Sequence, residues 1–204
     1  MSDTLPITLA MTGASGAAYG LRLLACLLKA HRRVYFMISD AARTVVKMEI
    51  GIELPADTLA LEHFLTERFS AKEKQLTVFG NMDWLAPPAS GTGGKIPMVI
   101  CPASGGVISA IATGASTNLV QRAADVAIKE KRPLIVVPRE MPASAIHLEN
   151  QLKLAQLGAT IMPASPGFYQ NPRSLDDIID FVVARILDQL DIPHQLLPRW
   201  GQTS

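Results

Sequence analysis

Short apolar runs alternate with longer helical patterns along this chain, and this alternation limits the possible folds more than any other feature. Five runs predict buried strands, at residues 7–12, 34–39, 97–102, 134–138 and 159–163. Strands that are apolar at nearly every position are typical of parallel sheets covered by helices on both faces. We therefore predict an α/β fold, a three-layer doubly wound parallel sheet of the Rossmann or flavodoxin-like type. The length suits a single domain, 1–204, with a C-terminal tail at about 191–204.

Periodic segments between these runs predict the helices that cover the sheet. Helices are expected at residues 17–29, 41–50, 58–69, 106–112, 118–131, 143–157 and 174–189. The segment 80–95 is rich in Gly, Pro, Ala and Ser and is too long for a plain connection, so we expect a functional flap there. A doubly wound sheet binds its ligands beyond the carboxyl ends of the strands, where the strand order reverses.

The balance of charged and apolar residues indicates what the surface can bind. A net charge of +1 leaves no basic excess, so no nucleic-acid partner is expected. Charged residues make up 18% of the chain, below the roughly 25% that is usual. We therefore expect part of the surface to be buried between copies of the chain in a homo-oligomer. Cys26 and Cys101 form no C-x-x-C motif and are expected to be buried thiols of a reducing compartment.

One uncharged segment, residues 96–121, is long enough to cross a bilayer. Prolines and glycines interrupt it, so we predict a buried strand followed by a buried helix, and no membrane span. Residues 1–6 lack the basic region of a signal peptide, and a cytoplasmic location is expected. The four histidines share no ligand spacing, and no metal site is predicted.

Small and hydroxyl residues follow three of the predicted strands. They are Gly13, Ala14 and Ser15 after the first strand, Ser39 after the second, and Ser104, Gly105, Gly106 and Val107 after the third. Glycines let the backbone approach a ligand, and a helix N-terminus offers free N–H groups to a phosphate. A tight turn that binds nothing explains the first segment equally well, and a lone serine at such a place is more often a helix cap. Three serines delivered to one crevice favour a phosphate or ribityl site.

Charged residues occur at two further places that suggest function. Arg139 and Glu140 directly follow the strand at 134–138, where a charge needs a partner or a ligand. Arg139 can hold a phosphate or a flavin carbonyl with Glu140 as its partner, or the two can form a plain structural ion pair. Glu49 lies near the end of the helix at 41–50, where a solvated helix end is the alternative to a functional role.

Longer motifs make a resemblance to one family specific, and they run nearly from end to end of the chain. They are Met11–Gly16, Asp83–Gly91, Cys101–Ser104, Thr113–Ala115, Asn118–Leu119, Arg122–Lys129, Pro138–Glu140, His147–Asn150, Pro166–Tyr169 and Leu197–Trp200. Through these residues the chain strongly resembles the UbiX-type flavin prenyltransferases. They belong to the larger group of homo-oligomeric flavin proteins that includes the flavin-dependent cysteine decarboxylases.

The resemblance implies an activity and its partners. Reduced flavin mononucleotide (FMN) attacks dimethylallyl monophosphate and phosphate leaves, without a metal. Bonds form at the central-ring nitrogen of the flavin and at a neighbouring benzenoid carbon. The product is prenylated FMN, the cofactor of UbiD-type decarboxylases, which serve ubiquinone synthesis in many bacteria. The family also implies a homo-oligomer, a dodecamer.

The resemblance also implies roles for individual residues. Flavin binding falls to Gly13, Ala14, Ser15, Ser39, Ser104, Gly105, Gly106, Val107 and Arg139. The prenyl phosphate falls to Lys129, Glu140, Tyr169 and Arg185, with Ser90 and Arg122 nearby. Ser15, Glu49, Lys129 and Glu140 are the catalytic candidates, with Glu49 as the acid/base for ring closure. The family's hydroxyl residue after Ser104 is replaced by glycine here, and its contact is in doubt.

Elementary chemistry agrees with this distribution. A phosphate that leaves without a metal needs cations, and Lys129, Arg139 and Arg185 are expected beside the flavin to supply them. An allylic cation needs a dry pocket with aromatic faces, for which Trp84, Tyr169 and Trp200 are suitable, although Trp200 suits oligomer packing almost as well.

Two other functions are compatible with the same fold. A flavin-dependent decarboxylase of this group carries a catalytic histidine on the loop before the third strand, and residues 80–95 contain none. A non-catalytic FMN carrier would bind flavin without turnover, and it would have no need of the cationic residues.

Overall fold

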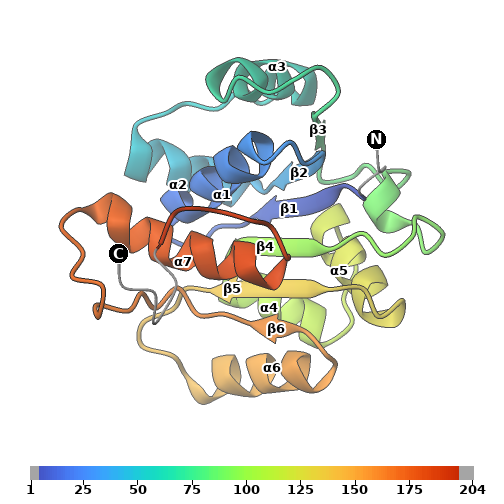
Figure 1. Cartoon of the computed structure of the whole chain (residues 1–204). Helices are drawn as coiled ribbons and strands as arrows, with labels where there is room; N and C mark the ends of the chain where they lie inside the picture. The colour runs from blue at the N-terminus through green and yellow to red at the C-terminus, as the bar shows by residue number, and fades with distance from the viewer. Residues whose placement is uncertain (1–4, 198–204) are drawn as a thin grey trace.

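A six-stranded, wholly parallel sheet runs through the middle of the molecule (Figure 1). The computed structural model describes residues 5–197. The strands are β1 (Ile7–Met11), β2 (Val34–Ile38), β3 (Leu76–Phe79), β4 (Met98–Ala103), β5 (Leu134–Pro138) and β6 (Thr160–Ile161). Their order is β3-β2-β1-β4-β5-β6, so the order reverses between β1 and β4, which lie side by side. This arrangement places a switch point at the carboxyl ends of β1 and β4.

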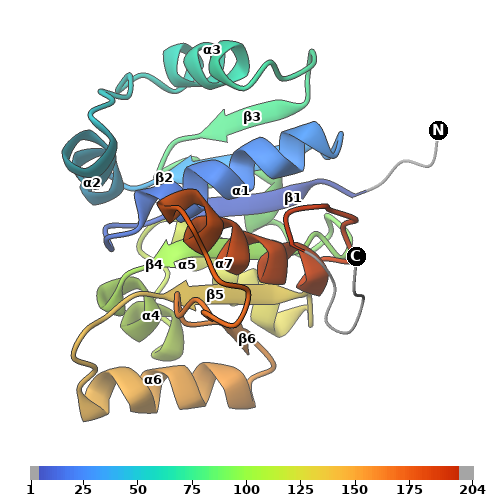
Figure 2. The same ribbon diagram turned by 60° about the vertical axis from the view of Figure 1, so that its left-hand side comes forward.

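Helices cover both faces of the sheet, which confirms the predicted three-layer architecture (Figure 2). One face packs against α1 (Ala17–Lys29), α2 (Asp40–Ile50), α3 (Thr58–Arg68) and α7 (Leu175–Gln189). The other packs against α4 (Gly105–Ala112), α5 (Leu119–Lys129) and α6 (Ala145–Gln156). A short 3-10 helix, η1 (Pro87–Ala89), lies within the 80–95 loop. Successive residues of β4 enter opposite cores, Val99 on one face and Ile100 on the other, and this is why the strand is apolar throughout.

The edges of the sheet are where sequence and structure differ. β3 was not expected, because its four residues alternate between buried and half-buried positions and carry no continuous apolar run. The edge strand β6 has two residues, against the five predicted at 159–163. An edge strand has one neighbour, so fewer of its positions need to be apolar, and the sequence signal is correspondingly weak.

The uncharged segment 96–121 folds as predicted, into the buried strand β4 and then the helix α4. Within residues 5–197, no helix combines the length and the apolar character needed to cross a membrane. Most helices begin at a side-chain cap, which sets where each one starts. The caps are Ser39, Asp57, Ser104, Asn118, Ser144 and Ser174.

Candidate functional site at the switch point

A buried hydroxyl joins the two loops that flank the switch point. Thr12 directly follows β1 and is almost fully buried. Its Oγ1 donates to the carbonyl of Pro102 at 2.9 Å and accepts the backbone N–H of Ser104 at 2.8 Å. The side chain therefore sets the distance between the loop after β1 and the loop after β4. The sequence predicts Thr12 only as the last residue of a strand, because no local pattern reveals a partner 92 residues away.

Replacing Thr12 by Val should lower the free energy of unfolding by about 1–3 kcal/mol, because the Ser104 N–H loses its acceptor in a partly buried place. Urea titration measures this, and FMN affinity should fall with it as the two loops separate. Thr113→Val is the matched control, because that exposed hydroxyl bonds only within its own helix, to the carbonyl of Ser109 at 2.9 Å. Equal stability losses in the two variants would remove the special role of Thr12.

The serines at the ends of β2 and β4 are helix caps. Ser39 Oγ accepts the N–H of Ala42 at 3.1 Å, and Ser104 Oγ accepts that of Val107 at 3.4 Å. Capping uses the acceptor side of each hydroxyl and leaves its proton available to a ligand. The cap interpretation is therefore confirmed, and it does not compete with flavin binding at the same edge.

The loop after β1 lies close to the first turn of α2. A Cβ added to Gly13 would meet the Cβ of Ala41 at 2.5 Å, so only glycine fits there. Gly16, at the N-terminus of α1, has φ of 107°, a left-handed conformation that favours glycine. Ala14 is buried and Ser15 is exposed, so Ser15 is accessible to a ligand.

Glu49 reaches from the end of α2 to the N-terminus of α1. Its carboxylate accepts the N–H of Gly16 at 3.0 and 3.1 Å and that of Ala17 at 2.8 Å. Burial by itself raises the pKa of Glu49, but hydrogen bonds from Ser15, Ala17 and Gly16 and the charge of Arg139 outweigh it, so the pKa lies below its ordinary value. Glu49 is exposed, but its ionised carboxylate is fixed by these hydrogen bonds. The alternative of a freely solvated helix end is therefore wrong.

Acid should weaken the contribution of Glu49 to stability. Its pKa is lower in the folded chain than the ordinary 4.5, so its stabilisation is complete above that value and is lost as the pH falls through the folded pKa. The free energies of unfolding of the protein and of Glu49→Gln should converge below about pH 4.5. Urea titrations at several pH values check this, and a difference that stays constant into acid would contradict it.

Arg139 and Glu140 do not pair with each other, against the expectation from sequence. Arg139 Nε donates to the carbonyl of Ser15 at 3.3 Å, which joins the end of β5 to the loop after β1. Glu140 turns the other way, and its Oε2 lies 3.9 Å from Nε2 of His147. Adjacent residues at the end of an extended strand point in opposite directions, and this separates the two side chains.

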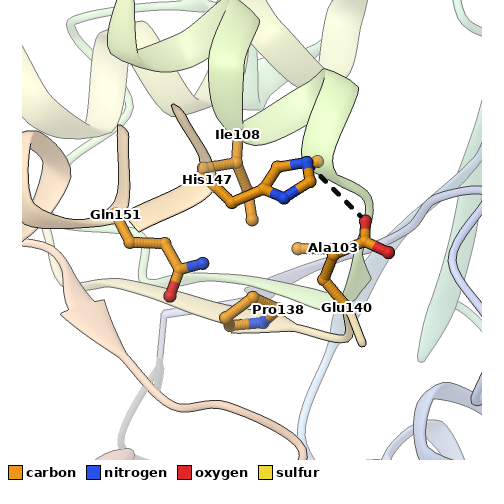
Figure 3. Close-up of a pocket in the computed structure, with 7 residues that line it drawn as sticks. Ala103, Ile108, Pro138, Glu140, His147 and Gln151 are labelled. Atoms are coloured by element: carbon orange, nitrogen blue, oxygen red, sulfur yellow. Dashed lines mark ion pairs between the residues drawn. The ribbon is translucent and has the colours of Figure 1, made fainter. Parts of the chain in front are cut away.

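His147 was not among the predicted site residues. Its Nδ1 accepts the N–H of Ser144 at 3.1 Å in the capping box of α6, which leaves Nε2 to carry a proton toward Glu140. Figure 3 shows the carboxylate of Glu140 and the imidazole of His147 facing each other across a small cavity lined also by Ile108 and Gln151. Gly105 packs directly against the imidazole of His147. A Cβ at this position would lie 2.9 Å from the ring, so a larger residue would displace His147. The signal for His147 was its place in the His147–Asn150 motif.

Lys129 and Ser90 lie at the opposite, amino edge of the sheet. Lys129 ends α5, just before the turn that leads into β5, and its Nζ is 3.1 Å from Oε1 of Glu130. The carbonyl of Ser90 accepts a hydrogen bond from Arg132 in that same turn. Arg139 follows the other end of β5, and a five-residue strand spans roughly 16 Å. Within one chain, Lys129 and Ser90 therefore do not reach the crevice that holds Ser15.

Arg185 is also displaced from that crevice. It lies on α7, five residues beyond Asp180, which pairs with Arg22 of α1 at 2.6 Å. Since both helices start at the carboxyl edge, Arg185 lies toward their far ends, where its guanidinium contacts Asp188 at 2.6 Å. The expected cluster of Lys129, Arg139 and Arg185 is therefore not formed within a single chain.

The remaining candidates among the described residues lie at or near the surface. Arg122, in the first turn of α5, pairs with Asp125 at 3.2 Å. Trp84 is partly exposed on the 80–95 loop. Tyr169 is exposed on the segment between β6 and α7 and packs edge-to-face on Phe181, with ring centroids 5.6 Å apart. Trp200 lies outside the described residues.

Comparison with known proteins now identifies the family. A family model described as Flavoprotein matches residues 1–187. The flavin prenyltransferase UbiX of Pseudomonas aeruginosa is 59% identical over 202 residues, 99% of this chain and 97% of that protein. The chain belongs to the UbiX flavin prenyltransferase family. UbiX of Halalkalibacterium halodurans is 46% identical over 195 residues, and the match covers 96% of this chain and 93% of that protein.

Solved structures of the UbiX family have the same fold. AnUbiX (PadA1), in complex with FMN and dimethylallyl pyrophosphate, has a TM-score of 0.84 and 33% identity, and the match covers 98% of this chain and 99% of that one. A dodecameric, FMN-dependent Ubix-like decarboxylase from Escherichia coli O157:H7 has a TM-score of 0.83 and 35% identity, covering 98% and 100%. The AnUbiX complex shows that a protein of this fold binds FMN. Among the described residues, no cluster of three His, Cys, Asp or Glu side chains could hold a metal ion.

Proposed function

We propose that this protein transfers the dimethylallyl group of dimethylallyl monophosphate to reduced FMN and releases phosphate. One observation carries the proposal within this flavin prenyltransferase family. The ionised carboxylate of Glu49 is held by Ser15 and the first amides of α1, with Arg139 beside it, at the switch point where we place the flavin. Because this carboxylate is ionised at neutral pH, it can accept the proton that ring closure releases.

The carboxyl edge of the sheet supplies the proposed flavin site. The backbone of Gly13 and Ala14, the hydroxyls of Ser15, Ser39 and Ser104, and the first turn of α4, Gly105, Gly106 and Val107, line this edge. Gly106 has open space where a Cβ would be, so a ligand can approach its backbone. Arg139 adds a positive charge toward the same loop. Reduced FMN, when bound here, supplies the electron-rich ring atoms that receive the prenyl group.

The cations for the leaving phosphate come, in this proposal, from a neighbouring subunit. Lys129, Ser90 and Arg185 lie away from the flavin crevice of their own chain, whereas Glu140 lies at its carboxyl edge. A homo-oligomer in which the amino edge of one chain meets the carboxyl edge of another would complete the site. The Escherichia coli relative is a dodecamer, and we propose the same assembly here. Exposed apolar residues on α6, Ile146, Leu148 and Leu152, are suited to be buried in it.

The proposal also includes the use of the product and the location of the protein. Prenylated FMN would serve a UbiD-type decarboxylase as its cofactor, in ubiquinone synthesis. The proposed location is the cytoplasm, which two free thiols support, the half-buried Cys26 and the buried Cys101.

Anaerobic incubation with reduced FMN and a dimethylallyl phosphate tests the reaction, with mass spectrometry to detect the product. The monophosphate and the diphosphate are compared in parallel, since the AnUbiX structure holds the pyrophosphate. We expect prenylated FMN with the monophosphate. Tight FMN binding without product from either donor would favour a carrier and overturn the proposal.

A further inference from the structure

Arg132 is a buried cation whose burial needs an explanation. It lies in the turn between α5 and β5 and is only 6% exposed. Within residues 5–197 it forms no ion pair with a carboxylate, and its Nε has no acceptor. A buried charge is costly unless it is paired or hydrogen-bonded. The hydrogen bonds of its side chain go to two backbone carbonyls of the 80–95 loop, from Nη2 to Ser90 at 2.8 Å and to Gly91 at 2.9 Å.

These two carbonyls belong to the turn that faces Lys129. A Cβ added to Gly91 would lie 3.5 Å from Nζ of Lys129 and 2.8 Å from Oε1 of Glu130, so the turn and the end of α5 are in close contact. On the turn itself, Ser90 Oγ lies 2.9 Å from Oγ1 of Thr92 and accepts the N–H of Thr92 at 3.3 Å. The distance between the Ser90 hydroxyl and the Lys129 ammonium is thus set by how the turn is held.

Arg132 is well placed to hold that turn. It comes three residues after Lys129, and its own N–H bonds back to the carbonyl of Ala127 at 2.8 Å, which anchors it to the last turn of α5. One guanidinium nitrogen with two N–H groups can bond two successive carbonyls at once, and a charged donor makes both bonds stronger. The loop is thereby tied to the helix that carries Lys129.

We propose that Arg132 is a positioning residue, which holds the turn of Ser90 and Gly91 against Lys129 so that hydroxyl and ammonium act together on the prenyl phosphate. This inference rests on the proposed function, in which Ser90 and Lys129 bind that phosphate. Arg132 itself does not touch the substrate, because its guanidinium is buried beneath the loop.

Arg132→Met tests the proposal, because it keeps an apolar side chain of similar length and removes both donors. The KM for dimethylallyl monophosphate should rise about tenfold or more, while the Kd for FMN stays within about twofold, since the flavin residues lie at the other edge. Arg132→Lys should recover part of the loss. Arg32→Met is the matched control, because Arg32 also has a buried Nε without an acceptor, but it donates to the carbonyl of Leu5 and not to Ser90 or Gly91.

Amide hydrogen exchange measures how firmly the loop is held, and it does not depend on enzyme activity. Amides of residues 90–92 should exchange faster in Arg132→Met than in the unaltered protein, and their exchange should stay unchanged in Arg32→Met. An unaltered KM together with unaltered exchange in Arg132→Met would overturn the inference, as would equal changes in both arginine variants. If the unaltered protein forms no product, the proposed function fails, and the exchange comparison still decides whether Arg132 holds the turn.

A second variant keeps the test decisive if Arg132→Met does not fold. Arg132→Gln keeps a polar side chain at this place but is too short to hold the carbonyls of Ser90 and Gly91, so the turn loses its tie to α5. We expect the same rise in KM for the prenyl phosphate, again with FMN affinity retained. An Arg132→Gln protein with an unchanged KM would show that the hold of Arg132 on the turn does not matter.

Discussion

Glu49→Gln should slow formation of the ring-closed product by about 10²–10⁴-fold, the usual range for loss of a general base. The side-chain amide oxygen of Gln can still accept the N–H groups of Gly16 and Ala17, so the end of α1 stays in place. What is lost is the ability to take up a proton. Ring closure should therefore slow more than the first attachment of the prenyl group, and FMN affinity should change little.

Rapid quenching followed by mass spectrometry and absorbance spectroscopy separates the two steps. Glu53→Gln is the control, because Glu53 is an exposed carboxylate that follows the same helix and pairs only with Lys47, at 3.1 Å. Its product formation should match that of the unaltered protein. Undiminished product formation by Glu49→Gln would remove Glu49 from the mechanism.

Mixed oligomers of two inactive variants should regain activity if the site is shared between subunits. Lys129→Met removes the cation at the amino edge, and Glu49→Gln removes the base at the carboxyl edge. In an oligomer assembled at random from equal amounts of both, about a quarter of the shared sites would combine two intact residues. Co-expression with two different tags allows the mixed species to be purified and its turnover measured.

A matched mixture shows whether such recovery is specific. Glu49→Gln mixed with Ser15→Ala places both changes at the same edge, where the Ser15 hydroxyl bonds Glu49, so no intact site can form. Recovery in the first mixture and none in the second supports a shared site. If the first mixture stays inactive while each variant still assembles, both residues act from one chain and the proposed arrangement is wrong.

The centre of the sheet is the part of the fold that the sequence predicts best. β1, β4 and β5 are buried at every position, and the order of strands and helices follows from where the apolar runs begin and end. A central parallel strand must be apolar on both faces, so its sequence is distinctive. The edge strand β3 is held on one side only, and its composition did not reveal it.

Among the site residues, those with local contacts can be predicted from the sequence, and those with distant contacts cannot. Serines and glycines after the strands were recognisable because capping and turn chemistry depend on neighbouring residues. The pairing of Glu140 with His147, the bond from Thr12 to the loop after β4, and the buried Arg132 were not, since each joins segments that only folding brings together.

Local order along the chain therefore determined the parallel sheet, its switch point and the loops that carry the candidate flavin residues, because hydrophobic periodicity and capping act over a few neighbouring residues. The tertiary structure decided which side chains meet. It brought Glu49 to the N-terminus of α1, across 33 residues, and it placed Lys129 and Arg139 at opposite edges of the sheet. Contacts of that kind depend on the packing of helices against the sheet, which sequence spacing does not encode.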